Sequence, residues 1–341
     1  MLRLKKSSSE SLSAGAPAGA ANQLAAPHLG AASAAHNSRN QLWRQVRRKW
    51  SRLLMAVPGI VWLLIFSYIP MFGVIIAFKD FRFDKGILGS DWVGLDNFRF
   101  LFGTRDALRI TFNTLFLNAV FIVTDTVAAI AVAILLYQVQ RHFLSRFYQA
   151  TLFFPYFISW VIVGIFVFAL LSQGGVVNNL LVGVGLPKVQ WYSSPQYWPG
   201  ILTLAHLWKS VGFWSLVYFA GILAINPELY EAAAVDGANA WRRVLHITLP
   251  LLVPLMIINV LLSIGRIFYA DFGLFFFVTR GEGLLLPTTD VIDTYVYRAL
   301  TKSANIGMAS AAGFYQAIVG FTLVLVTNWV VRRINPERSL F

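Results

Sequence analysis

Residues 53–78 read LLMAVPGIVWLLIFSYIPMFGVIIAF, a long run without a single charged side chain. The hydrocarbon core of a bilayer is about 30 Å thick, and about 20 helical residues cross it. A run of this length therefore predicts a helix that spans a membrane. It also lacks the alternation of apolar and polar residues that is typical of a barrel strand.

Five further apolar runs of similar length follow along the chain. Together with the first they give six predicted spans: Leu53–Phe78, Phe112–Tyr137, Tyr148–Leu171, Ile201–Ile225, Leu251–Val278 and Met308–Val331. The sequence thus predicts an all-α membrane protein with six transmembrane helices. Kinks are expected at the four prolines in or beside these runs, because each removes a backbone donor: Pro58, Pro70, Pro155 and Pro254.

The composition supports this interpretation. Of 341 residues, 57% are hydrophobic and only 13% are charged, which is too little polar surface to cover a soluble protein of this size. The formal net charge is +13, but many of the cations flank apolar runs, as in membrane proteins, and do not form a basic groove for nucleic acid. The chain has no cysteine, which excludes disulfides and cysteine-based metal sites.

Clusters of cations indicate the orientation of the chain. They lie just before the first span and just after the last: Arg44, Arg47, Arg48, Lys49 and Arg52, then Arg332 and Arg333. Both termini are therefore expected in the cytoplasm. Residues 1–40 are small and polar without an apolar signal-peptide core, which predicts a disordered cytoplasmic tail ahead of a transmembrane domain over 41–341. Residues 43–53 fit either a helix on the membrane surface or an extension of the first span.

The loop after the fourth span, residues 226–250, reads NPELYEAAAVDGANAWRRVLHITLP. Asn226 is a good cap for a short helix, and Gly237 suits the left-handed residue that ends it. Asn239 is placed to cap a second helix, which is expected to stop before Pro250. The three alanines at 232–234 would give the first helix a bare face, which is typical of a surface that docks on a partner.

Seven positions of this loop resemble the EAA loop of bacterial binding-protein-dependent ABC importer permeases: Glu231, Ala232, Ala233, Gly237, Ile247, Leu249 and Pro250. Further segments extend the likeness to the maltose-type carbohydrate permeases, within them to the branch that takes up polysaccharide-derived oligosaccharides: 93–98, 113–114, 208–209, 212–214, 294–297 and 307–313.

This resemblance implies a multi-pass permease of a bacterial cytoplasmic membrane that forms half of a pathway for an oligosaccharide. Its partners would be a second permease subunit, two ATPase subunits, an extracytoplasmic solute-binding protein and membrane lipid. The loop at 226–250 would dock on the ATPase, with Glu231 as a polar anchor and Ile247, Leu249 and Pro250 packing the second helix. ATP and Mg²⁺ would bind the ATPase, since this chain has no Gly-Lys dipeptide and hence no phosphate loop. Without known enzyme motifs, we expect no catalytic residue, cofactor or metal site in the chain.

Four ionisable residues lie well inside the predicted spans: Asp125, Lys209, Arg266 and Asp271. A charge at the middle of a membrane helix costs about 2.5–3.5 kcal/mol unless it is paired or wetted. Depth along the helices predicts the pairs Asp125 with Arg266 and Lys209 with Asp271. They either line a translocation path or only brace the helices. A proton relay is less favoured, because His206 has no carboxylate near it in the sequence.

Aromatic residues offer a second set of candidates for the substrate path, because sugars stack on aromatic rings. Within the spans these are Trp208, Trp214, Tyr218 and Tyr269, for which helix packing is an equally sufficient explanation. Four more aromatic residues precede the fourth span, and interfacial anchoring is the favoured interpretation there: Trp191, Tyr192, Tyr197 and Trp198.

Two alternative functions stay open: an importer of the same architecture for a non-sugar solute, and an ion-coupled secondary carrier. The second is less favoured, because the sequence has no repeated halves.

Overall fold

The computed structural model describes residues 50–99, 103–139 and 142–334. They belong to two compact units, Met1–Pro70 and Met71–Phe341. The predicted tail over 1–40, the four cations Arg44, Arg47, Arg48 and Lys49, and most of the predicted surface helix lie outside the described residues. In the first unit the chain forms α2 (Trp50–Leu63) and a π turn (Leu64–Tyr68), and α3 (Ile69–Met71) follows.

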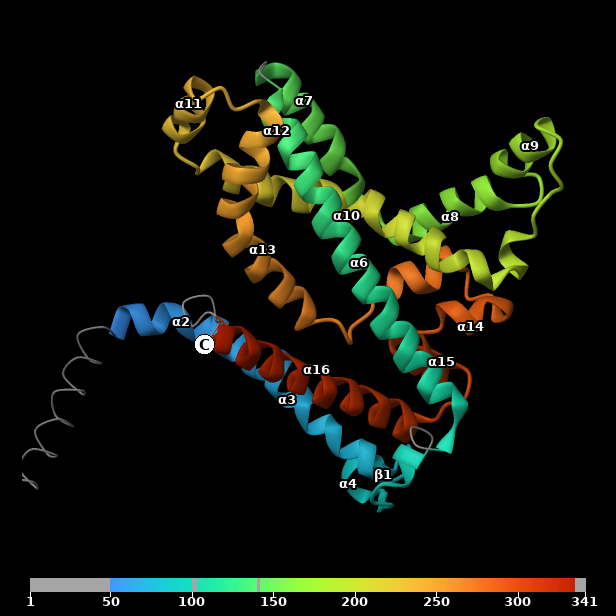
Figure 1. The fold of residues 1–341 in the computed structure, drawn as a ribbon. Helices are drawn as coiled ribbons and strands as arrows, with labels where there is room; N and C mark the ends of the chain where they lie inside the picture. The colour runs from blue at the N-terminus through green and yellow to red at the C-terminus, as the bar shows by residue number, and fades with distance from the viewer. Residues whose placement is uncertain (1–49, 100–102, 140–141, 335–341) are drawn as a thin grey trace, which may run out of the picture. The chain divides into compact units, whose positions relative to one another are not determined.

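Long apolar helices dominate the described part of the chain (Figure 1). Five helical segments there are long and apolar enough to cross a membrane: Leu54–Phe78, Arg105–Gln138, Trp160–Gly183, Ala240–Ile264 and Ile306–Arg333. A sixth is reached when Pro195–Leu223 is counted together with Pro227–Val235, which follows it at a bend of 70°. The predicted all-α membrane fold is confirmed.

The second unit contains the following elements. The longer helices are α6 (Arg105–Gln138), α7 (His142–Phe153), α8 (Trp160–Leu171), α10 (Trp198–Leu223), α13 (Leu249–Ile264), α15 (Ile292–Thr301) and α16 (Ile306–Ile334). The shorter ones are α4 (Gly86–Gly89), α9 (Val176–Gly183), α11 (Pro227–Val235), α12 (Ala240–Arg243) and α14 (Leu286–Thr289). Short segments of 3-10 or π helix lie at 72–78, 96–98, 154–157, 191–193, 195–197, 244–248, 274–278 and 283–285. The strands β1 (Lys79–Asp80) and β2 (Asp91–Trp92) pair antiparallel.

The predicted third span, Tyr148–Leu171, is not one helix. α7 ends at Phe153, a 3-10 turn covers Phe154–Phe157, and α8 begins only at Trp160. Pro155 cannot donate to the α7 ladder, and the side chain of Ser159 caps α8 by accepting from the Ile162 N–H. The apolar run hid this break because its residues are hydrophobic on both sides of the proline.

The predicted fifth span, Leu251–Val278, is also too long. α13 ends at Ile264, turns follow, and a π turn forms at Leu274–Val278. Asp271 starts this turn, because its Oδ1 accepts from the N–H groups of Gly273 and Leu274 at 3.0 and 3.4 Å. The sequence analysis predicted Arg266 and Asp271 in the interior of this helix. In the structure both residues lie after its end.

Two prolines are accommodated without a break. The N–H groups of Ile69 and Leu249, each directly before a proline, bond five residues back to the carbonyls of Leu64 and Val244. The widened π turn makes room for the proline ring, so the helix continues. The prediction that the second loop helix stops before Pro250 is wrong for this reason: α12, the π turn Val244–Thr248 and α13 form one helical segment.

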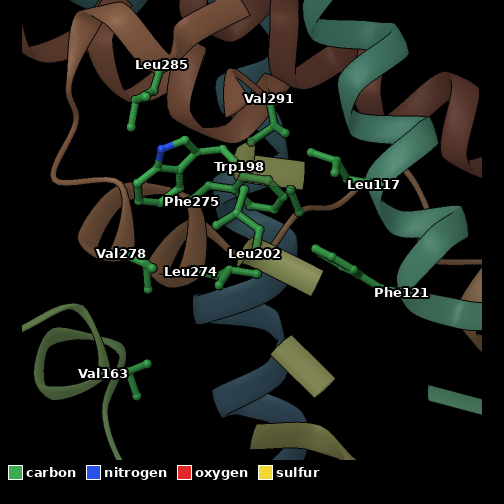
Figure 2. Packing of buried hydrophobic residues seen from close by; sticks show 11 residues of the cluster. Leu117, Phe121, Val163, Trp198, Leu202, Leu274, Phe275, Val278, Leu285 and Val291 are labelled. Atoms are coloured by element: carbon green, nitrogen blue, oxygen red, sulfur yellow. The ribbon is translucent and has the colours of Figure 1, made fainter. Parts of the chain in front are cut away.

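The largest cluster of buried hydrophobic residues in the described part of the chain joins α6, α10 and the segment 274–291 (Figure 2). Its buried residues are Leu117, Phe121, Val163, Trp198, Leu202, Ala270, Leu274, Phe275, Val278, Leu285 and Val291. In a membrane such a cluster is stabilised by close packing and not by removal from water, since lipid is as apolar as leucine. Trp198 is fully buried, and its Nε1 donates to the Trp191 carbonyl at 2.8 Å.

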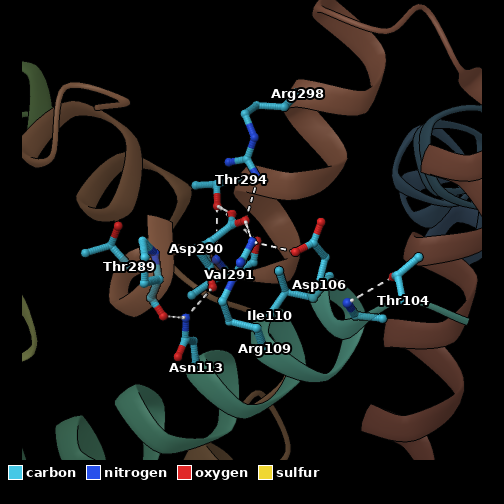
Figure 3. A network of polar contacts seen from close by, with 12 residues as sticks. Thr104, Asp106, Arg109, Ile110, Asn113, Thr289, Asp290, Val291, Thr294 and Arg298 are labelled. Carbon is cyan, nitrogen blue, oxygen red and sulfur yellow. Dashed lines mark hydrogen bonds and ion pairs between the residues drawn. The ribbon is translucent and has the colours of Figure 1, made fainter. Parts of the chain in front are cut away.

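A polar network fixes the start of α6 against α14 and α15 (Figure 3). The buried Asp290 carboxylate lies 2.5 Å from a guanidinium nitrogen of Arg298 and 3.6 Å from one of Arg109, and accepts from the Thr294 hydroxyl at 3.0 Å. On α6, Asn113 donates to the Asp290 carbonyl at 3.0 Å. These bonds attach the segment around Asp290, which follows the 274–278 turn, to the start of α6.

Asp290→Ala is expected to lower the free energy of unfolding by about 2–3 kcal/mol. Removing one member of a buried ion pair typically costs about 3–5 kcal/mol, and the partial exposure of Arg298 and Arg109 reduces that value. Thermal unfolding of the detergent-purified protein, followed by tryptophan fluorescence, measures the effect. Asp106→Asn is the matched control, because its ion pair with Arg109 is solvent-exposed and is worth less than about 1 kcal/mol. Equal shifts for the two variants would contradict the network.

Candidate translocation cavity and coupling loop

A cavity of about 190 Å³ lies between α6, α10 and the end of α13. Its walls are Asn118, Phe121, Ile122, Asp125 and Thr126 from α6, His206, Trp214 and Tyr218 from α10, and Asn259, Ser263, Arg266, Ile267 and Tyr269 from α13 and the turn after it. The structure thus brings together five of the eight predicted substrate-path residues: Asp125, Arg266, Trp214, Tyr218 and Tyr269. Lys209, Asp271 and Trp208 do not line this cavity.

Asp125 is bonded across the α6–α10 interface. Its Oδ2 lies 3.0 Å from His206 Nε2, and its Oδ1 accepts from the Ser210 hydroxyl at 2.7 Å. The predicted ion pair with Arg266 is therefore wrong: both residues line the cavity, but the carboxylate is held by α10. His206 has no carboxylate near it in the sequence, but the packing of α6 along α10 brings Asp125 to it. The His206 ring also stacks on Phe121, with ring centroids 4.3 Å apart.

Lys209 donates to backbone carbonyls and does not form the predicted ion pair with Asp271. Its Nζ donates to the carbonyls of Tyr156, at 2.7 Å, and Ile158. These carbonyls lie at the break between α7 and α8, where the helical ladder is interrupted. The predicted direct pair with Asp271 does not form. Trp160 lies between them, with its ring 5.3 Å from the ammonium and its Nε1 donating to the Asp271 carboxylate.

Lys209→Met is expected to lower the free energy of unfolding by about 2 kcal/mol, because it leaves two backbone carbonyls without a donor. Each unsatisfied carbonyl costs about 1–3 kcal/mol when fully buried. These two are partly exposed, which reduces the total. Asp271→Asn, which keeps an acceptor for Trp160, should change it by less than about 1 kcal/mol. Thermal unfolding of both variants and of the double variant checks this. A coupling energy between the two positions above about 1.5 kcal/mol would instead indicate a direct ion pair between Lys209 and Asp271.

The aromatic candidates separate into distinct groups. Tyr218 is 1% exposed and Trp214 half-buried, whereas Trp208 and Tyr269 are each 46% exposed. Trp198, the first residue of α10, is buried in the packed core, and Tyr192 in the preceding turn packs against it, so neither is an interfacial anchor. The Tyr192 hydroxyl donates to the Val278 carbonyl at 3.3 Å, and burial raises the pKa of this tyrosine to about 12. The expectation of anchoring is wrong for these two residues.

The loop after α10 folds largely as predicted. Asn226 Oδ1 caps α11 by accepting from the Glu228 N–H at 3.1 Å, and Asn239 Oδ1 caps α12 by accepting from the Arg242 N–H at 2.8 Å. Gly237 has φ +78°, and two bonds close the end of α11, from the N–H groups of Gly237 and Ala238 to the carbonyls of Ala234 and Ala233. This is the left-handed helix end expected for a glycine at this position.

One side of α11 is open and the other is tied to the long helices. Glu231, Ala232, Ala234 and Gly237 are exposed, and Ala233 is half-buried. On the inner side the Tyr230 hydroxyl lies 3.0 Å from Thr248 Oγ1, and its ring packs 5.7 Å from that of Tyr137. Leu249 packs in the cluster around Tyr218 and Leu252, Ile247 is half-buried, and Pro250 is exposed.

Residues 125–338, which include the loop and most of the cavity lining, match the family model of the binding-protein-dependent transport system inner membrane component. The chain belongs to this family. It is similar to the polygalacturonan/rhamnogalacturonan transport system permease protein YteP of Bacillus subtilis (strain 168), with 34% identity over 83% of this chain and 88% of that protein. Protein LplB of the same organism is 32% identical over 85% and 91% of the two chains.

Solved structures give the same result. The permease is similar to a chain in the crystal structure of a bacterial ABC transporter involved in the import of the acidic polysaccharide alginate, with a TM-score of 0.79, 35% identity, and coverage of 86% of this chain and 99% of that one. A second structure of the alginate transporter is in complex with an alginate pentasaccharide-bound periplasmic protein, with a TM-score of 0.78 and 35% identity over 86% and 98% of the chains.

The sequence analysis did not select as site candidates four polar residues of the cavity wall, nor Ser210, which bonds to Asp125: Asn118, His206, Asn259 and Ser263. A signal was present, because polar residues recur at helical spacing inside apolar runs. Asn118 and Asp125 are seven apart, His206 and Ser210 four apart, and Asn259 and Ser263 four apart, which places each pair on one face of its helix. Within the described residues of the permease no group of His, Asp and Glu is arranged to hold a metal ion.

Proposed function

We propose that this permease is one of two different transmembrane subunits of an ATP-driven importer for oligosaccharides or polysaccharide fragments. In this assembly two ATPase subunits bind its cytoplasmic loop, and an extracytoplasmic binding protein delivers the sugar. Both termini and α11 lie on the cytoplasmic side. The assignment is supported by the polysaccharide systems to which the relatives belong and by the alginate transporter, which has been solved with a pentasaccharide-loaded periplasmic protein.

The observation that carries the proposal is the exposed alanine side of α11, on a helix whose inner side is bonded to the long helices through Tyr230 and Thr248. In this proposal α11 docks in a groove of an ATPase, and the seven EAA-like positions support that role. Glu231 then forms the polar contact, Ala232 and Ala233 allow close approach, and Gly237 fixes the helix end. Ile247, Leu249 and Pro250 hold the following segment in place.

Movement of α11 has a direct path to the cavity. Thr248 belongs to the continuous helical segment Ala240–Ile264, which is roughly 37 Å long at about 1.5 Å per residue. Asn259 and Ser263, near its far end, line the cavity. Closure of the ATPase dimer would therefore displace a rigid rod whose other end forms a wall of the sugar path, which is a rigid-body coupling of two states. ATP and Mg²⁺ act on the partner ATPase, and this chain contributes no catalytic group.

Reconstitution tests this function. The permease is co-purified with its partner permease and ATPase and inserted into liposomes with ATP inside. Its binding protein and a labelled oligosaccharide are supplied outside. We expect uptake that needs ATP, stops with vanadate and survives an ionophore. Uptake by permease without a bound ATPase subunit, or uptake that the ionophore abolishes and vanadate does not, would contradict the proposal and favour an ion-coupled carrier.

A second cargo has a specific observation in its favour. The permease is 26% identical, over 83% of its length, to the sn-glycerol-3-phosphate transport system permease protein UgpA of Escherichia coli. The same reconstituted importer should therefore be offered sn-glycerol 3-phosphate as a competitor. Competition with the oligosaccharide would indicate a small phosphorylated solute as the cargo, whereas unchanged oligosaccharide uptake supports the sugar.

A further inference from the structure

The cavity between α6, α10 and α13 holds polar groups that the protein itself does not satisfy. Asn259 Nδ2 and His206 Nδ1 are buried and have no hydrogen-bond partner among the described residues. Arg266, in the same wall, is exposed, and its side chain makes none of the ion pairs found in the described part of the chain. Buried polar groups are nearly always satisfied, so the two buried exceptions in this cavity point to a ligand that supplies the missing partners.

The chemistry of these groups defines what that ligand carries. Arg266 offers a planar fork of donors that matches a carboxylate, and the Asn259 amide offers two further donors. His206 already faces Asp125 with Nε2. With its proton on that nitrogen, Nδ1 is an acceptor suited to a hydroxyl group. The cavity thus combines donors for an anion with an acceptor for an alcohol.

The Asp125 carboxylate does not compete for this anion site. Both of its oxygens are engaged, one by the Ser210 hydroxyl at 2.7 Å and the other by His206 at 3.0 Å. It orients the imidazole, whose ring is also fixed by stacking on Phe121. The exposed Arg266 forms no ion pair with any residue that the structure describes and is left to pair with a ligand.

The rest of the lining suits a sugar ring. Trp214, Tyr218 and Tyr269 contribute aromatic surface to the same cavity. At about 190 Å³ it is smaller than the roughly 300–1,000 Å³ of ordinary ligand pockets. A single sugar unit of a longer chain therefore fits this description better than a whole oligosaccharide.

We propose that this cavity is a subsite for a uronate, a sugar unit that bears a carboxylate. Arg266 binds the carboxylate, Asn259 donates to a neighbouring oxygen, and His206 accepts from a ring hydroxyl. A neutral sugar would leave Arg266 unpaired, so the subsite selects acidic chains inside the membrane domain, independently of the binding protein. This inference rests on the proposed function as an oligosaccharide permease and names the class of sugar.

Direct binding tests it. The permease complex with its partner permease and ATPase, in lipid nanodiscs and without binding protein, is titrated with labelled trigalacturonate and with the same trisaccharide after reduction of its carboxyl groups. A hydrogen bond to a charged group supports an expected preference for the acid of about 10-fold to 100-fold. This comparison needs no variant. Equal affinities, or no measurable binding of either sugar, would overturn the subsite.

Two variants locate the preference. Arg266→Gln should bring the affinity for trigalacturonate to within about threefold of that for the reduced sugar, because its loss of charge removes the anion partner. Lys188→Gln removes a positive charge from an exposed loop residue outside the cavity and should keep the full preference. Retained preference in Arg266→Gln contradicts the assignment. ATP-driven uptake of sugar without an acid preference would leave the proposed function standing while the uronate subsite fails.

Discussion

Gly237→Val is expected to reduce ATP-driven transport to less than a tenth of the wild-type rate. Gly237 has φ +78°, a conformation that costs a β-branched residue about 1–3 kcal/mol. The two hydrogen bonds that close α11 are worth about 1 kcal/mol each, so the strain suffices to open this end of the helix. A Cβ at this position meets no atom within 4 Å, and the effect is therefore one of backbone conformation and not of space. Uptake in proteoliposomes and co-purification of the ATPase measure it.

The controls separate a local from a global effect. Gly237→Asn should retain most of the transport, because asparagine tolerates the left-handed region. Gly237→Val itself should insert and unfold thermally like wild type, since the loop is exposed and contributes little to the core. Wild-type transport by the valine variant would show that the geometry of this helix end is not needed for coupling.

Local signals made the loop predictable. The caps at Asn226 and Asn239 and the left-handed Gly237 depend on interactions within a few residues, and the sequence carries the whole of that information. The position of each apolar run was predictable for the same reason, because a stretch of about 20 apolar residues has few alternatives in a membrane.

The breaks within the apolar runs were not predictable at the same level. Hydrophobicity alone does not reveal that one helix ends at Phe153 and the next begins at Trp160, or that α13 ends at Ile264 and a π turn begins at Leu274. The polar residues beside each break were informative in retrospect: Ser159 caps α8, and Asp271 starts the turn at 274–278. The sequence analysis included Ser159 and Asp271 in the spans because their neighbours are hydrophobic, and it did not consider them as caps.

The pairing of the charges required tertiary structure. Depth along straight helices placed Asp125 opposite Arg266, but helix rotation and the end of α13 at Ile264 decide which side chains meet. Asp125 turns to His206 and Ser210 on α10, and Lys209 satisfies carbonyls freed at the α7–α8 break. A carbonyl partner is invisible to any argument from side-chain charge, which explains why Lys209 was assigned to Asp271.

Gly212→Ala is expected to destabilise the permease more than the other substitutions, by at least about 3 kcal/mol. Gly212 lies on α10 where α7 ends, and a Cβ built there collides with the carbonyl of Leu152 and lies 2.9 Å from the Phe153 nitrogen. These are backbone atoms, which no side-chain rotation can move away. Overpacking of side chains typically costs about 1–3 kcal/mol, and a backbone obstacle raises that value. The variant must separate α10 from the end of α7, which also pulls Lys209 from the carbonyls of the break.

Gly200→Ala, on the same helix, provides the matched control. A Cβ at Gly200 meets no atom within 4 Å, and alanine favours the helix over glycine by up to about 1 kcal/mol. The two identical chemical changes should therefore act in opposite directions on the thermal unfolding temperature in detergent, with Gly212→Ala also losing the monodisperse peak in size-exclusion chromatography. Unchanged unfolding of Gly212→Ala would mean that α7 and α10 do not approach at the distance of bare backbones. In that case Lys209 would no longer reach the carbonyls of the break, and its pairing with Asp271 would again be the simpler account of the charge.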